Sequence, residues 1–295
     1  MATTTRAVST GFWRRRAASQ RLERGIAYGS LTLVGILYAI PFIWMVLTSL
    51  KFPWDIERIP PTWLPAEWAW ENYPNALLKP TRYFPLFFQN TLTYVGLSVI
   101  GQLLSCTLVA YGFARIPFKG RKFLFTLVLS TMMLPSQVLL IPQYLLFKQL
   151  GWLDSLLPLV VPNYFGTAFY IFLLRQFFMT IPRELDEAAV VDGANYFDIY
   201  WRILLPLCRP ILITVFALSF VAHWNDFFGP LIYLNSQSKM VVAVALRLFV
   251  VNALQLPIHE LMAASVATLI PVIAVFLFCQ RAFVRGITMT GLKEG

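Results

Sequence analysis

The sequence predicts an all-α membrane protein with six transmembrane helices and both termini in the cytoplasm. Its 295 residues are 58% hydrophobic and only 13% charged, whereas a soluble domain carries about 25% charged residues. Six apolar segments are long enough to cross a hydrocarbon core of about 30 Å as helices, which takes about 20 residues. The lysines and arginines are also distributed unevenly between the loops, as expected for a membrane protein with a fixed orientation.

Polar stretches separate the six expected spans. The spans lie at about 26–50, 88–114, 123–147, 157–179, 208–233 and 261–283. No alternating β-barrel pattern competes with them, and in lipid only helices and closed barrels satisfy every backbone polar group. Arg175, His223 and Asp226 interrupt the fourth and fifth segments, so these two are the least uniform. We expect a basic cytoplasmic tail, 1–25, followed by one transmembrane domain, 26–295, with a short cytoplasmic C-terminal tail.

The charge pattern orients the spans. With the N-terminus inside, seven of the 24 lysines and arginines face outside: Lys51, Arg58, Lys79, Arg82, Lys148, Lys239 and Arg247. The 14 acidic residues divide equally, so the whole formal charge of +10 lies inside. This satisfies the positive-inside rule. The basic excess is therefore a topology signal and not a sign of nucleic-acid binding, and binding to anionic inner-leaflet lipid is a second role open to it.

The first apolar run follows a basic region, as the core of a signal peptide does. Its length, 26–50, far exceeds the roughly 7–15 residues of a signal core, and no small-residue cleavage site follows it. We therefore expect an uncleaved first helix. The next stretch, 51–87, is rich in proline and tryptophan and is expected outside. It suits an interfacial belt and linker, and also a landing surface for another protein.

The polar stretch between the fourth and fifth spans, 183–206, predicts a short helix, a turn and a second helix. Thr180 is a candidate cap, and three acidic residues in the first turn suit the positive end of the helix dipole. Gly193 can end that helix in the left-handed conformation, and Asn195 can cap the next one. Three residues of the first helix are expected to share a flat face that a partner groove can approach: Leu185, Ala188 and Ala189.

The same loop holds a spaced motif, Glu-Ala-Ala, three residues, Gly, nine residues and Ile-x-Leu-Pro. Its residues are Glu187, Ala188, Ala189, Gly193, Ile203, Leu205 and Pro206. Glu-Ala-Ala alone is common in capped helices, but the joint spacing in this loop of a six-span chain is specific. It resembles the signature loop of bacterial ABC importer permeases. Further segments extend the resemblance over nearly the whole chain: Tyr111–Lys119, Met132–Pro135, Trp224–Asp226 with Gly229–Pro230, and Phe283–Gly291.

The resemblance is to carbohydrate-type permeases, including the smaller maltose-system permease. It implies a non-catalytic permease subunit of an ATP-driven importer, for a sugar or oligosaccharide, in a bacterial or archaeal cytoplasmic membrane. The implied partners are a second permease, a pair of ATPase subunits and an extracytoplasmic solute-binding protein. The loop 183–206 would dock on the ATPase as a cytoplasmic coupling helix between the fourth and fifth spans.

The sequence itself indicates that ATP is hydrolysed by another subunit. No Lys follows a Gly, so a phosphate-binding Gly-Lys-Ser/Thr turn is missing from the sequence. ATP and Mg²⁺ are therefore expected on the partner ATPase, and no cofactor or metal is expected in this chain. Two other classes of membrane protein are alternatives, an independent secondary carrier and a membrane enzyme. A carrier usually shows inverted repeats and charged relays, and an enzyme needs a clustered acid–base or metal constellation. Neither pattern is visible in the sequence.

A solute path is predicted from polar residues within the apolar spans, because exposing them to lipid is costly. The candidates are Gln137, Asn163, Tyr164, Asn225 and Asp226. Asp226 leads because a lone carboxylate in such a position needs a partner. The same side chains are equally suited to joining helices by hydrogen bonds across the bundle. Nothing in the sequence names the solute.

Overall fold

The computed structural model describes residues 10–79, 83–251 and 257–291, and within these ranges every regular element is a helix. Four helices are long and apolar enough to cross a membrane: Glu23–Ser49, Phe84–Arg115, Leu157–Phe178 and Ile258–Gln280. Two bent helix pairs raise the number to six if each pair is one span. The predicted all-α membrane class is therefore confirmed. Residues 1–9 of the expected tail and residues 292–295 lie outside the described ranges.

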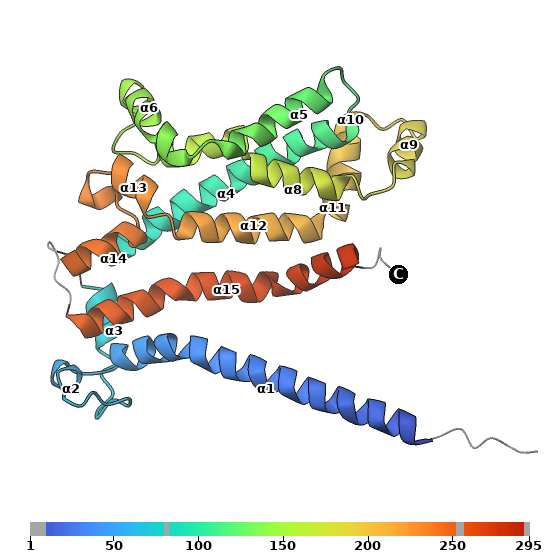
Figure 1. The fold of residues 1–295 in the computed structure, drawn as a ribbon. Helices are drawn as coiled ribbons and strands as arrows, with labels where there is room; N and C mark the ends of the chain where they lie inside the picture. The colour runs from blue at the N-terminus through green and yellow to red at the C-terminus, as the bar shows by residue number, and fades with distance from the viewer. Residues whose placement is uncertain (1–9, 80–82, 252–256, 292–295) are drawn as a thin grey trace, which may run out of the picture.

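The long helices lie side by side in a row (Figure 1). Helix α1 (Thr10–Ser49) packs along α15 (Ile258–Gly291), which packs along α12 (Arg209–Trp224). Helix α4 (Phe84–Arg115) lies between α12 and α8 (Ala168–Phe178). The start of α1, the end of α15 and the polar loop after α8 all lie at one end of the bundle (Figure 1). An even number of crossings requires this arrangement, while the side on which the cytoplasm lies stays a prediction.

The expected third span, 123–147, is not one straight helix. Helix α5 (Arg121–Ser130) continues into the 3₁₀ turn η2 (Thr131–Met133), and α6 (Ser136–Gln149) follows. The two halves are bent by 98°. The cause is Pro135, because a proline pushes the preceding residue out of the helical region, and Leu134 has an extended ψ of 120°. As a result α6 runs in a different direction from α5 (Figure 1), and the rings of Tyr144 and Phe147 in its second half contact the ring of Tyr233.

The expected fifth span, 208–233, also ends early. Helix α12 stops at Trp224, and a separate helix α13 (Phe228–Tyr233) begins after three intervening residues. Pro230 explains the break, since a proline has no N–H to donate and its ring clashes with the carbonyl of the residue four positions earlier. The fourth span is interrupted as well. It comprises α7 (Leu157–Val160), the 3₁₀ helix η3 (Val161–Phe165) and α8.

Several short helices were not predicted. Helix α14 (Val242–Val251) buries Val242, Ala245 and Phe249 against the start of α4 and α15. Ten residues rise only about 15 Å, too little to cross a bilayer. Two more, α2 (Pro53–Ile56) and α3 (Asn72–Leu77), fold the stretch after α1 into a cap. There the amide of Asn72 donates to the carbonyls of Ser49 and Lys51.

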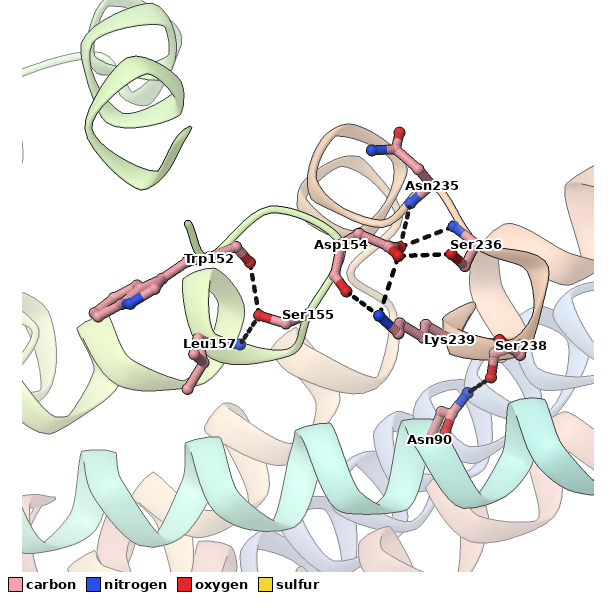
Figure 2. A network of polar contacts seen from close by, with 9 residues as sticks. All are labelled: Asn90, Trp152, Asp154, Ser155, Leu157, Asn235, Ser236, Ser238 and Lys239. Atoms are coloured by element: carbon pink, nitrogen blue, oxygen red, sulfur yellow. Dashed lines mark hydrogen bonds and ion pairs between the residues drawn. The ribbon is translucent and has the colours of Figure 1, made fainter. Parts of the chain in front are cut away.

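At the end opposite the start of α1, the carboxylate of Asp154 holds two loops together (Figure 2). Its Oδ1 accepts the backbone N–H groups of Asn235 and Ser236 at 3.0 and 2.8 Å. Its Oδ2 accepts the Ser236 hydroxyl at 2.6 Å and forms an ion pair with Lys239 at 3.1 Å. The short 3₁₀ helix η5 (Gln237–Lys239) is thereby fixed to the loop after α6. These hydrogen bonds, led by that of Ser236, hold the pKa of Asp154 well below its usual range.

We expect Asp154→Asn to loosen this junction without disturbing the backbone, because Asn tolerates the left-handed φ of 56° that Asp154 adopts. The amides of Asn235 and Ser236 should exchange hydrogen faster. A depressed pKa makes the stabilisation present above the ordinary pKa of aspartate, and it is lost as the pH falls below that value. Wild type should therefore approach the variant at acid pH. Equal exchange rates near neutral pH would contradict this, and Glu57→Gln, an exposed acid, is the control.

Candidate functional site

The predicted loop after α8 does contain a short helix, α9 (Glu184–Val191). Its N-cap is Arg183, so the prediction that Thr180 caps it is wrong. The Thr180 hydroxyl instead donates to the carbonyl of Phe177, and Thr180 therefore belongs to the end of α8. Three acidic residues occupy the first turn of α9 as predicted, where they face the positive end of the dipole.

The turn after α9 has the predicted chemistry. Gly193 has a φ of 85°, in the left-handed region, and its N–H bonds to the carbonyl of Val190. Asn195 then caps the next helix, α10 (Tyr196–Asp198), in a reciprocal capping box with Asp198. Six π-helical residues, η4 (Ile199–Leu204), and the short α11 (Leu205–Leu207) follow. This second helical arm meets α12 at an angle of 78°.

The faces of α9 differ from the prediction. Ala189 is buried against the bundle, whereas Leu185 and Ala188 are exposed. Consecutive residues of a helix point about 100° apart, so the two alanines of the motif cannot serve one surface equally. Ala189 lets α9 lie close to its own bundle, while the side chains of Leu185, Val190 and Val191 are exposed on different sides of the helix. The idea of one flat alanine face is therefore wrong.

Arg115, the last residue of α4, anchors α9 to the bundle. Its Nη1 pairs with Asp186 at 3.1 Å, and its Nη2 donates to the carbonyls of Phe178 and Ile181 at 2.8 Å each. The Arg115 side chain is only 4% exposed. Burial raises the pKa of the Asp186 carboxyl, and the guanidinium of Arg115 opposes that rise. One buried cation thus joins the ends of α4 and α8 to the first turn of α9.

Two further contacts join α4 to the second helical arm. The Tyr111 hydroxyl donates to the carbonyl of Tyr196 at 2.8 Å. The hydroxyls of Thr107 and Tyr200 lie 2.8 Å apart in a buried hydrogen bond. A cavity of about 290 Å³ remains between α4 and the loop, lined by residues that include Glu187 and Arg183. The whole loop therefore rests on one face of α4.

The remaining motif residues support this arm. Ile203 and Leu205 are half-buried and pack against the core cluster around the second half of α4, whereas Pro206 is exposed. Glu187 is exposed as well. The seven motif residues are thus brought into one loop, and their roles in docking stay predictions.

A second group of polar side chains lies inside the bundle, between α4, η3 and α12. The Ser219 hydroxyl donates to the side-chain oxygen Oε1 of Gln102 at 2.7 Å, and the side-chain amide of Gln102 donates to the hydroxyl of Thr167. His223 contacts the backbone carbonyl of Ser219 and the side chain of Asn163 through its two ring nitrogens. These contacts form a chain of polar groups across the interior of the bundle.

The predicted path residues do not all lie in this chain. Asp226 lies near it and accepts the Tyr94 hydroxyl at 2.8 Å and the Gly229 N–H at 3.1 Å. Asn225 is exposed and its amide donates to the carbonyl of Val221 on its own helix. Tyr164 packs its ring against Gly101 of α4, where an added Cβ would lie 2.4 Å from the ring. Gln137 lies in the first turn of α6, on the far side of the 98° bend from α5.

Sequence reasoning missed several members of this network. Four polar residues of α4 recur at spacings of three to four residues and so form one stripe along the helix: Tyr94, Ser98, Gln102 and Ser105. That stripe was a usable signal in the second span. His223 was treated only as an interruption of the fifth span, although it contacts Asn163. Asp226 makes two hydrogen bonds in the structure. Its role in a solute path stays a prediction.

We expect Asp226→Ala to destabilise the protein. The substitution removes an acceptor that caps the first turn of α13, worth about 1 kcal/mol. It also leaves the buried hydroxyl of Tyr94 without its partner, which costs about 1–3 kcal/mol. Thermal unfolding in detergent should show a lower midpoint for Asp226→Ala than for Asn225→Ala, whose side chain bonds only within α12. Equal midpoints would show that the two hydrogen bonds carry no stability.

Comparison with known proteins agrees with this architecture. Residues 106–289 match the family of binding-protein-dependent transport system inner membrane components. The chain is 33% identical over 265 residues to a probable ABC transporter permease, YurM, of Bacillus subtilis, covering 89% of this chain and 86% of that protein. It is 31% identical over 273 residues to the trehalose/maltose permease MalG of Thermococcus litoralis, covering 92% and 98%.

A solved structure shares the fold. It is a bacterial ABC transporter involved in the import of the acidic polysaccharide alginate, with a TM-score of 0.80 and 24% identity over 95% of this chain and 99% of that chain. Since the family match spans more than half of the sequence, including the loop from α9 to α11, this chain belongs to the family of binding-protein-dependent transport system inner membrane components.

Proposed function

We propose that this chain is the transmembrane permease subunit of an ATP-driven ABC importer for a sugar or oligosaccharide. The observation that carries the proposal is the geometry of α9, a helix anchored to α4 by Arg115 while the apolar side chains of Leu185 and Val191 remain exposed. The solute class is supported by the names of relatives, which include trehalose/maltose and arabinooligosaccharide permeases. In this proposal the chain is not catalytic, and a separate ATPase holds ATP and Mg²⁺.

The exposed surface of α9 suits a protein groove better than lipid. Leu185, Val190 and Val191 are exposed, and Val191 is 87% exposed. Acidic residues, Glu184, Glu187 and Asp192, surround them on the same helix. Charges of this density do not enter the hydrocarbon core, so these apolar side chains need a partner at the membrane surface. A short helix that exposes apolar side chains among acidic ones can dock in a protein groove, here that of the ATPase.

The contacts between α9 and the bundle would transmit movement of the docked ATPase to the membrane helices. Arg115 and Tyr111 connect α9 and α10 with α4, and the arm that follows α9 leads into α12. Closure of the ATPase pair would therefore carry α4 and α12 with it as a rigid-body change. The polar chain through Gln102, Ser219 and His223 lies between those two helices and would move with them relative to the rest of the bundle.

The remaining partners follow from the same proposal. The apolar surfaces of α1 and α15 remain largely exposed, since only 6% and 11% of their spanning windows are buried within this chain. We assign that surface to lipid and to the second permease subunit. The end that carries Asp154 and the cap formed by α2 and α3 would face the solute-binding protein. The alginate importer has been solved with its alginate pentasaccharide-bound periplasmic protein.

The test is the retention of the ATPase during purification. Val191→Asp should weaken retention by about tenfold or more, because it replaces apolar contact with a desolvated charge. The control is Val250→Asp, the same substitution at an exposed valine at the opposite end of the bundle. Equal retention by wild type and Val191→Asp would remove the docking role from α9.

A further inference from the structure

A second cavity lies beside the first, between the turn that follows α4 and the start of α9. Its volume is about 550 Å³. Four of its eight lining residues are cations, Arg115, Arg121, Lys122 and Arg183, and none is an acid. Two phenylalanines, Phe118 and Phe123, line it as well. The proposed docking of α9 makes no use of this cavity.

The charges around the cavity are not balanced within the chain. Among the described residues, the only ion pair made by these four cations joins Arg115 to Asp186. Arg121, Lys122 and Arg183 form none. Like charges around one hollow repel one another, and the low dielectric of nearby protein and lipid strengthens the repulsion. An anion bound in the cavity would relieve it.

The backbone and Arg115 add donors at the same place. Gly120 has a φ of 82° and is the N-cap of α5, whose first turn contains no acidic side chain. A ten-residue helix therefore directs its positive end at the turn. Independently, the Nε of Arg115 is buried and has no hydrogen-bond partner in the described part of the chain. The Arg115 guanidinium thus lines the cavity with one buried N–H unpaired, beside three cations that form no ion pair in the described part of the chain.

The apolar part of the lining identifies the kind of anion. Phe123 is 71% exposed and lies at the start of α5, where Leu124 and Leu127 are also exposed. A free phosphate gains nothing from such a surface, and a nucleotide base that stacks on one ring leaves Leu124 and Leu127 uncovered. An amphiphile gains from both parts, because its phosphate can reach the cations while its acyl chains lie along α5. Basic pockets between transmembrane helices are suited to anionic lipid headgroups.

We propose that this cavity binds the phosphate of an anionic phospholipid of the phosphatidylglycerol type. Arg115 and Arg183 line both this cavity and the one beneath α9. The bound headgroup therefore contacts the same two residues that position the start of α9, and lipid in this site stabilises the position of α9 on the bundle. The site extends the proposed function and does not depend on the ATPase.

The experiment measures lipid binding to the purified full chain by native mass spectrometry, without any partner subunit. The probes are phosphatidylglycerol and phosphatidylcholine, each titrated against wild type and against Arg121→Gln/Lys122→Gln. Each basic residue near a membrane surface contributes about fivefold in affinity. The double variant should therefore bind phosphatidylglycerol about 25-fold more weakly than wild type, with phosphatidylcholine binding unchanged.

Two comparisons make the result specific. Arg24→Gln/Arg209→Gln removes two exposed cations from the same end of the bundle and should keep wild-type binding. Arg121→Lys/Lys122→Arg preserves the charge and should keep it too, which separates charge loss from misfolding. Equal binding by wild type and Arg121→Gln/Lys122→Gln would overturn the site. An equal loss in the Arg24/Arg209 control would show diffuse surface charge instead. Displacement of phosphatidylglycerol by excess inorganic phosphate would overturn the lipid as the occupant.

Discussion

Gly193→Val should abolish coupling between the ATPase and transport while the membrane helices still insert. Gly193 has a φ of 85°, where a non-glycine residue costs about 1–3 kcal/mol and a β-branched one is least tolerated. An added Cβ meets nothing within 4 Å, so the effect is conformational and not a collision. The chain would leave the turn, and α9 would lose its position relative to α10. Solute-stimulated ATP hydrolysis and ATPase retention should fall by about tenfold or more.

The matched control for this result is Gly193→Asn. Asparagine visits the left-handed region readily, so it keeps the turn while adding a side chain of similar size to valine. We expect it to retain most of the coupling. If Gly193→Val transports as well as wild type, the turn has no part in coupling. If Gly193→Asn fails to the same extent as Gly193→Val, the glycine is needed for close approach of a partner and not for its backbone conformation.

Arg115→Met should have the second large effect. Methionine preserves much of the apolar stem of arginine but none of its donors. The Phe178 and Ile181 carbonyls and the Asp186 carboxylate would all lose their partner. Removing one member of a buried ion pair typically costs about 3–5 kcal/mol. We expect faster hydrogen exchange throughout α9, a lower unfolding midpoint and loss of ATPase retention.

The control for Arg115→Met is Arg202→Gln, in the same loop. The Arg202 side chain is 77% exposed and pairs with Asp198 four residues earlier. Exposed pairs of this kind contribute only about 0.3–0.5 kcal/mol. Arg202→Gln should therefore behave as wild type in both measurements. If Arg115→Met leaves hydrogen exchange in α9 unchanged, then α9 is held by apolar contacts such as Ala189 and not by the guanidinium.

Features of the fold that depend on local chemistry could be predicted from the sequence. The spans follow from apolar length, the turn at Gly193 from its conformational freedom, and the second helix from the capping side chain of Asn195. Pro135 lies near the middle of the third apolar segment, where a proline favours a kink, and the 98° bend is found there. The break before Pro230 was not predicted, and the size of either bend depends on what packs on both sides of it.

Features that depend on distant packing could not be predicted. Ala189 is buried because α9 lies against the bundle, which no pattern within 183–206 specifies. Asp226 finds Tyr94, which lies 132 positions earlier in the chain. Arg115 counted only as one of many charges that orient the spans, although its side chain joins three elements. In each case the partner is supplied by tertiary structure, and a single sequence carries no record of the pairing.

The packing of α1 against α15 has a consequence for the synthesis and membrane insertion of the protein. Helix α1 finds its main neighbour in α15, which begins only at Ile258. At a synthesis rate of about 5–20 residues per second, α1 waits roughly 10–40 s in the bilayer before that neighbour exists. During this interval its own length and hydrophobicity, together with the cap formed by α2 and α3, hold it in place. Helix α1 is therefore made early but reaches its packed state late, when α15 has been synthesised.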